Sequence, residues 1–272
     1  MFWILRMAST SETGLQLFAR LTARPSLVGL DYVLFPDGPN AKEVIELSGE
    51  PSCGKTLLFS QFIVKCILPT EKKNVKVGGL KAGVILLNTD HHFQMYKLVS
   101  LMEAHLKAVS ETFSVSDVED IVKNSLDRLI IYNITDSAQL LVTFHALHTV
   151  VSNRPEIGLI LLDSVCAFYW QDSMTSGIRK MDLYAKNVLK TLQKTLGDFK
   201  GVVMYSRPAY FQSKSGKLEK CSFEPSVGSV NRKIVLKRTE QEHVFSGSIE
   251  TPTGQSLRLF TIDSAGIHWI EQ

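Results

Sequence analysis

The sequence predicts an α/β domain with a mostly parallel central sheet flanked by helices and a C-terminal antiparallel β extension. Three observations predict it. The stretch GEPSCGKT at 49–56 matches G-x-x-x-x-G-K-[ST], a phosphate-binding loop (P-loop) that joins a strand to a helix. Continuous apolar runs at 83–90, 158–164 and 201–206 alternate with stretches of helical period. From residue 233 onward, alternating segments are separated by turn signals.

The elements follow the chain in a β–α alternation. Before the loop we expect a short helix at 11–24, an irregular segment at 35–40 and a strand at 43–49. After the loop we expect a helix at 55–68, an exposed loop at 72–81, a strand at 83–90, helices at 91–109 and 117–126, a strand at 128–134 and a helix at 136–151. A strand at 158–164, a helix at 179–198 and a strand at 201–206 complete the alternation, and antiparallel strands at 233–238, 243–250, 257–262 and 266–271 follow.

Composition limits the class of protein. A chain of 272 residues with 44% hydrophobic residues can bury the core of one such domain. The net charge of +3 is mild, whereas dedicated DNA-binding domains carry a denser basic patch. Four cysteines, at 53, 66, 166 and 221, are widely spaced, which is typical of free thiols in a reducing compartment. The start MFWILRM is too short an apolar run for a signal peptide or a membrane span, so we expect no membrane association; the start site is Met1 or Met7.

The P-loop residues predict ATP and Mg²⁺ binding. Glycines at both ends of the loop let backbone amides approach phosphate oxygens, and the helix after them offers its positive end. Lys55 is expected to neutralise phosphate and the Thr56 hydroxyl to ligate Mg²⁺, with Asp163 at the end of a buried strand as the second metal partner. The expected nucleotide-binding residues are Gly49, Glu50, Pro51, Ser52, Cys53, Gly54, Lys55, Thr56 and Asp163.

Hydrolysis needs a carboxylate that orients or deprotonates water near the γ-phosphate. Asp90, which ends the strand at 83–90, is the candidate. His91 and His92 follow it, and we interpret them as capping and packing residues rather than metal ligands.

The succession GEPSCGKT, VILLNTDHHF, LILLDSVCAFYW and GVVMYSRPAYFQ resembles the RecA-type recombinase core, and among its members the recombinase paralogues. The resemblance runs from about residue 13 to the C-terminal hairpin, so it covers nearly the whole chain. It implies a RecA-like P-loop NTPase fold, a nuclear role in homologous-recombination repair of double-strand breaks and damaged replication forks, and work as one subunit among other recombinase paralogues. Single-stranded or branched DNA would then be reached through that complex.

Departures from the family pattern imply weak or absent hydrolysis. Active recombinases have a glutamate where this chain has Asp90, and a shorter side chain places the carboxylate about 1–1.5 Å farther from the water. They have a glutamine, which senses the γ-phosphate, where this chain has Arg207. The Phe-x-x-Ala tether of active recombinases is missing, and residues 1–40 are expected to form an N-terminal segment without a separate DNA-binding domain. Residues 41–272 then form the ATPase core.

The resemblance also assigns two DNA-facing loops, at 171–178 and 207–230. The second carries the basic residues that are candidates for DNA contact: Arg207, Lys214, Lys217 and Lys220. A simple solvated loop explains these cations equally well. Phe168, Tyr169 and Trp170 could stack on bases, but core or interface packing is the favoured interpretation because they directly follow a buried strand.

The leading hypothesis is therefore an adaptor subunit that binds ATP–Mg²⁺ and turns it over feebly. A free-standing P-loop ATPase or small-molecule kinase is the alternative. A lid rich in arginine after the mid-chain helices would favour a kinase, and for such a lid this chain offers only the scattered Arg128, Arg154 and Arg179. A non-enzymatic DNA-binding module is the third reading, and the mild charge weakens it.

Overall fold

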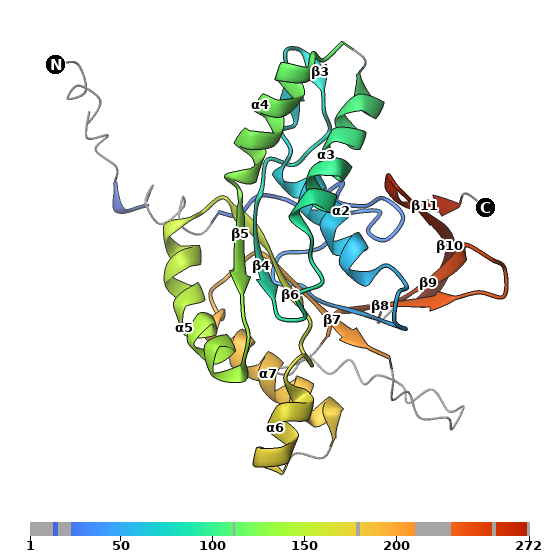
Figure 1. Ribbon diagram of the computed structural model, residues 1–272. Coiled ribbons are helices and arrows are strands. Elements are labelled where there is room, and N and C mark those ends of the chain that lie inside the picture. The colour runs from blue at the N-terminus through green and yellow to red at the C-terminus, as the bar shows by residue number, and fades with distance from the viewer. Residues whose placement is uncertain are drawn as a thin grey trace.

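A nine-stranded sheet forms the centre of the protein (Figure 1). The computed structural model describes residues 13–15, 23–110, 112–177, 180–209, 230–251 and 254–270. Across the sheet the strands run in the order β11-β10-β9-β8-β1-β7-β6-β4-β5. Because strands distant in the chain are neighbours in the sheet, helical crossovers must connect the parallel part.

Six strands are parallel to one another. In order across the sheet they are β8 (Arg232–Arg238), β1 (Val44–Gly49), β7 (Val202–Pro208), β6 (Ile157–Asp163), β4 (Gly83–Asn88) and β5 (Leu129–Asn133). β1, β4 and β6 are buried along their whole length, as expected of strands covered on both faces. The predicted mostly parallel sheet is therefore confirmed.

The C-terminal extension is antiparallel from β9 onward. It consists of β9 (Val244–Thr251), β10 (Gly254–Asp263) and β11 (Gly266–Ile270). The prediction that 233–238 belongs to this antiparallel run is wrong in part, because β8 pairs in parallel with β1 and is antiparallel only to β9. Local alternation shows that a segment is a strand, but it does not show on which neighbour the strand docks.

Helices cover both faces of the parallel part (Figure 1). One face carries α2 (Lys55–Ile67), α3 (Met95–Val109) and α4 (Val115–Leu126), and the other carries α5 (Ser137–Asn153) and α7 (Met181–Thr195). Each face has its own apolar cluster, and Phe62 and Phe144 are fully buried members of the two. Residues 27–35 also contribute Leu27, Leu30, Leu34 and Phe35 to the α2 side.

Several segments differ from expectation. The segment assigned as the first DNA loop is mostly a helix, α6 (Tyr169–Ser176), which projects beyond the sheet (Figure 1). α3 begins at Met95 rather than 91, since His91 has a positive φ of 56° that a helix does not accept. A small hairpin, β2 (Glu71–Lys72) with β3 (Val75–Lys76), lies in the expected loop. Most of the expected helix at 11–24 lies outside the described residues.

None of the helices in the described ranges is long and apolar enough to cross a membrane.

Candidate nucleotide-binding site

The P-loop connects the end of β1 to the first turn of α2. Two of its residues have positive φ, Ser52 at 59° and Gly54 at 87°, which turns the backbone around a concave space. A Cβ on Gly49 would lie 2.6 Å from the Leu236 carbonyl oxygen of β8, so only glycine fits there. α2 has no acidic residue in its first turn and no side-chain cap, which leaves its first amides available to an anion.

Lys55 folds back over the loop. Its Nζ donates to the carbonyl oxygens of Gly49 at 3.1 Å and Glu50 at 2.8 Å. Burial lowers the pKa of Lys55, while the nearby carboxylates of Asp163 and Asp90 oppose that shift. A phosphate group would offer this ammonium a stronger partner than two neutral carbonyls.

The predicted metal partners lie together. Thr56 Oγ1 donates to Asp163 Oδ2 at 2.7 Å, and Ser206 Oγ donates to Asp163 Oδ1. Asp163 is buried at the carboxyl end of β6, next to Ser206 at the same end of β7. The Thr56 hydroxyl gives its hydrogen to the carboxylate and keeps its lone pairs for a cation, so this donor set fits Mg²⁺ held by one hydroxyl, phosphate and waters.

Asp90 lies beside the same cluster. The backbone amides of Thr89 and Asp90 donate to the Asp163 carbonyl oxygen at 2.8 and 3.0 Å, which fixes the end of β4 against β6. Burial raises the pKa of Asp90, and the Asp163 charge adds to the rise. The structure thus brings the candidate catalytic carboxylate close to Lys55 and Asp163.

The remaining loop residues divide by exposure. Glu50, Pro51 and Ser52 are exposed, whereas Cys53 is fully buried and belongs to the apolar cluster under α2. Burial raises the pKa of the Cys53 thiol, which makes it a packing residue rather than a nucleophile. Of the adjacent histidines, His91 contacts the Ile134 carbonyl oxygen at 3.0 Å, and the described residues hold no group of three or more candidate metal ligands.

Arg207 is held by two carboxylates. It pairs with Asp182 at the start of α7 and, at 3.7 Å, with buried Glu46 of β1. Glu46 also accepts a hydrogen bond from Tyr205 at 2.7 Å. These partners hold Arg207 on the face of the sheet that α7 covers, opposite to the face of Ser206. The other three candidates for DNA contact, at 214, 217 and 220, lie outside the described residues.

Three polar residues that no sequence motif singles out lie in the same row as Asp163: Ser206, Asn88 and Asn133. Asn88 and Asn133 end their strands, and Ser206 follows the apolar part of β7, two residues before its end. A polar residue directly after an apolar run is the signal that could have found them. In a parallel sheet the carboxyl ends of the strands meet at one edge, where ligands bind.

Comparison with known proteins gives consistent findings. The sequence model of the Rad51 family matches residues 26–221. DNA repair protein XRCC2 of Mus musculus is 35% identical over 169 residues, which cover 61% of this chain and 56% of that protein. The DNA repair protein XRCC2 homolog of Arabidopsis thaliana is 24% identical over 188 residues, with 57% and 50% covered.

The chain therefore spans about half the length of the curated relatives it matches. Among solved structures, the crystal structure of the RadB recombinase covers 92% of this chain and 99% of its own, with a TM-score of 0.61 and 18% identity. At that identity the likeness shows the fold alone, and it confirms the predicted RecA-like architecture.

Proposed function

Because this chain belongs to the Rad51 family, we propose that it is a recombinase-paralogue subunit that assists homologous-recombination repair of DNA in the nucleus. The family match over 26–221 is the observation that carries this proposal, and the similar proteins of Mus musculus and Arabidopsis thaliana are both named as DNA repair proteins. In this proposal residues 41–272 are the working core, and other recombinase paralogues are its partners.

The P-loop site is proposed to bind ATP with Mg²⁺. The 2.7 Å hydrogen bond from Thr56 to Asp163 supports this, since it brings together a hydroxyl and a carboxylate, the kinds of oxygen group that Mg²⁺ binds. Loop amides, Lys55 and the start of α2 would hold the phosphates. Mg²⁺, when bound, would neutralise phosphate charge.

Turnover is proposed to be weak. Asp90 is one methylene shorter than the glutamate of active recombinases, so its carboxylate would lie farther from the attacking water. Arg207, at the position of the family's sensing glutamine, is engaged by Glu46 and Asp182. An arginine held by two carboxylates is poorly placed to report the γ-phosphate to a DNA-facing loop.

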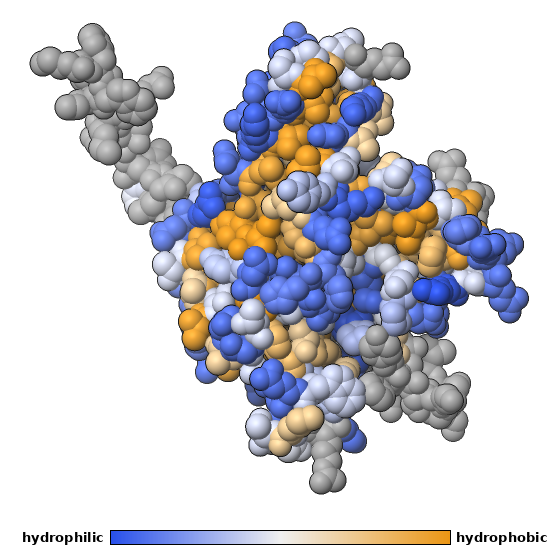
Figure 2. All heavy atoms as spheres, viewed as in Figure 1, coloured by the Kyte–Doolittle hydropathy of each residue, from blue (hydrophilic) through white to orange (hydrophobic). Residues whose placement is uncertain are grey.

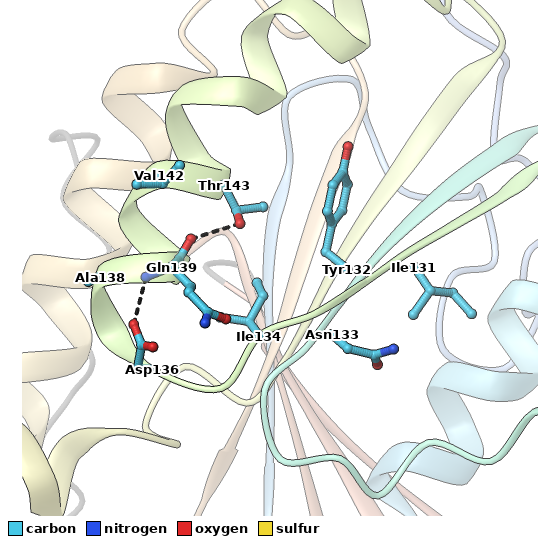
Figure 3. A pocket seen from close by; sticks show the side chains of 9 residues that line it. All are labelled: Ile131, Tyr132, Asn133, Ile134, Asp136, Ala138, Gln139, Val142 and Thr143. Carbon is cyan, nitrogen blue, oxygen red and sulfur yellow. Dashed lines mark hydrogen bonds between the residues drawn. The ribbon is translucent and has the colours of Figure 1, made fainter.

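The partner is proposed to dock at the β5 edge of the sheet. Among the described residues β5 pairs only with β4, so within that part of the chain one side of its backbone is open to a strand from another chain. A groove of about 530 Å³ lies beside it, between β5 and α5. Ile131 and Tyr132 of β5 lie on one side and Val142 and Thr143 of α5 on the other (Figure 3).

The surface chemistry agrees with this choice. Figure 2 shows apolar side chains in a band from α4 over the β5 end of the sheet, and Val142 in the groove is 69% exposed. At the opposite edge the Gln61 side chain already occupies the backbone of Ile267 in β11, accepting from its amide and donating to its carbonyl. We therefore assign the β5 groove to an extended apolar segment of a second recombinase paralogue.

Co-expression with recombinase paralogues tests the proposal. We expect a stable complex that retains nucleotide after purification. A chain that stays monomeric with every paralogue, and instead phosphorylates a metabolite or runs as a solitary ATPase, would support the alternative function and contradict the adaptor.

A further inference from the structure

Four neighbouring parallel strands carry polar residues at or near their carboxyl ends, on one face of the sheet. These are Asn133 of β5, Asn88 of β4, Asp163 of β6 and Ser206 of β7, and Asn88 is in register with both Asn133 and Asp163. The residues two positions earlier on β4, β6 and β7 (Leu86, Leu161 and Met204) pack in the cluster under α2. Because side chains two apart share a face, the polar row faces the start of α2, where Thr56 lies.

Asn88 is the one member of this row with an unfilled buried acceptor. The residue is only 5% exposed. Its Nδ2 donates to Asn133 Oδ1 at 2.8 Å, on the β5 side. Its Oδ1 is buried and has no hydrogen-bond partner among the described residues. A buried carbonyl oxygen without a donor is uncommon and calls for a ligand or a water to fill it.

We propose that Asn88 is a positioning residue for the metal, with its Oδ1 accepting a hydrogen bond from a water of the nucleotide-bound Mg²⁺. This inference rests on the proposed ATP–Mg²⁺ site. Mg²⁺ gives up its waters reluctantly and keeps several of them when it binds to proteins. Each such water is a strong donor that needs an acceptor nearby.

The neighbouring groups leave that role open. Each Asp163 oxygen already accepts one hydroxyl hydrogen, from Thr56 or from Ser206, so the waters of a hydrated cation need further acceptors beside it. Asn88 lies one strand away from Asp163 at the same level, on the same face. Outer-shell acceptors of this kind typically change metal affinity by 10- to 100-fold when removed. The other role open to Asn88 is structural, as the donor that fixes Asn133.

The test compares nucleotide binding by the purified chain in Mg²⁺ and in EDTA, with a non-hydrolysable ATP analogue and calorimetry. Asn88→Ala is expected to lower affinity about tenfold in Mg²⁺ and to leave affinity in EDTA unchanged. Asn133→Ala is the matched control, because it removes the partner of Nδ2 but not the free Oδ1; we expect its Mg²⁺ advantage to match that of the unmodified protein.

Asn88→Asp gives a second readout that does not require the alanine variant to fold. Mn²⁺ binding in the presence of the analogue, followed by electron paramagnetic resonance, should become tighter in Asn88→Asp than in Asn133→Asp, since the new charge would face the metal hydrate. Equal losses in Mg²⁺ and EDTA for Asn88→Ala, no loss at all, or equal Mn²⁺ binding by the two aspartate variants would each overturn the inference. An unmodified protein that binds no nucleotide would instead overturn the proposed site itself.

Discussion

Lys55→Ala separates nucleotide binding from partner assembly. The change removes two hydrogen bonds to loop carbonyls, at 3.1 and 2.8 Å, worth about 1 kcal/mol each. The change also removes an ammonium whose pKa is lowered by burial. Because burying that charge is unfavourable, its removal offsets part of the lost folding free energy. The net cost to folding is therefore below about 2 kcal/mol, or roughly 4–8 °C in melting temperature for a domain of this size.

Nucleotide affinity should fall far more. A charge-assisted contact to phosphate contributes about 1.5–3 kcal/mol, which corresponds to roughly 10- to 100-fold in the dissociation constant. The assay combines thermal unfolding, calorimetry with ATP–Mg²⁺, and co-purification with a recombinase paralogue. We expect a folded variant that binds ATP poorly and still joins the complex. A folded Lys55→Ala protein that no longer assembles would refute the reasoning, because assembly would then require the nucleotide.

Two further predictions concern the buried Asp90 and the exposed Val142. Burial raises the pKa of Asp90, so the folded state disfavours its ionised form, and Asp90→Asn should raise the melting temperature at pH 7. That gain in melting temperature should vanish as the pH falls below about 3.9, where the carboxyl is neutral in the folded and the unfolded state. A gain that does not depend on pH would contradict the raised pKa of Asp90. Val142→Asp in the β5 groove should leave stability within about 0.5 kcal/mol and weaken partner binding at least tenfold. Leu257→Asp, at an exposed residue of β10 outside that groove, is its control, and equal losses in pull-down would rule out the groove.

Much of the fold could be predicted from local pattern. Strands such as 158–164 are continuous apolar runs, and a run of that length bounded by turn signals is a strand buried on both faces. The P-loop could be predicted because its glycines and Lys55 stand in one short continuous pattern, at 49–56, and need no contact with a distant part of the chain to be recognised. The antiparallel β9–β11 extension could be predicted because neighbouring strands in the chain pair with each other.

What could not be predicted depends on contacts between distant parts of the chain. β8 docks on β1, and nothing in 232–238 indicates that neighbour. α6 was missed because eight residues give too short a period to recognise a helix. The row that links Asn88 to Asp163 exists only because β4 lies between β5 and β6, an order that the sequence does not contain. Read alone, each of these polar residues looks like the start of a turn.

ATP turnover by the isolated chain, with and without single-stranded DNA, tests the adaptor account most directly. Binding of ATP–Mg²⁺ with little hydrolysis, and no acceleration by DNA, is the predicted result. Fast hydrolysis that DNA stimulates would show that a site with Asp90 and Arg207 supports ATP turnover, and it would contradict the account.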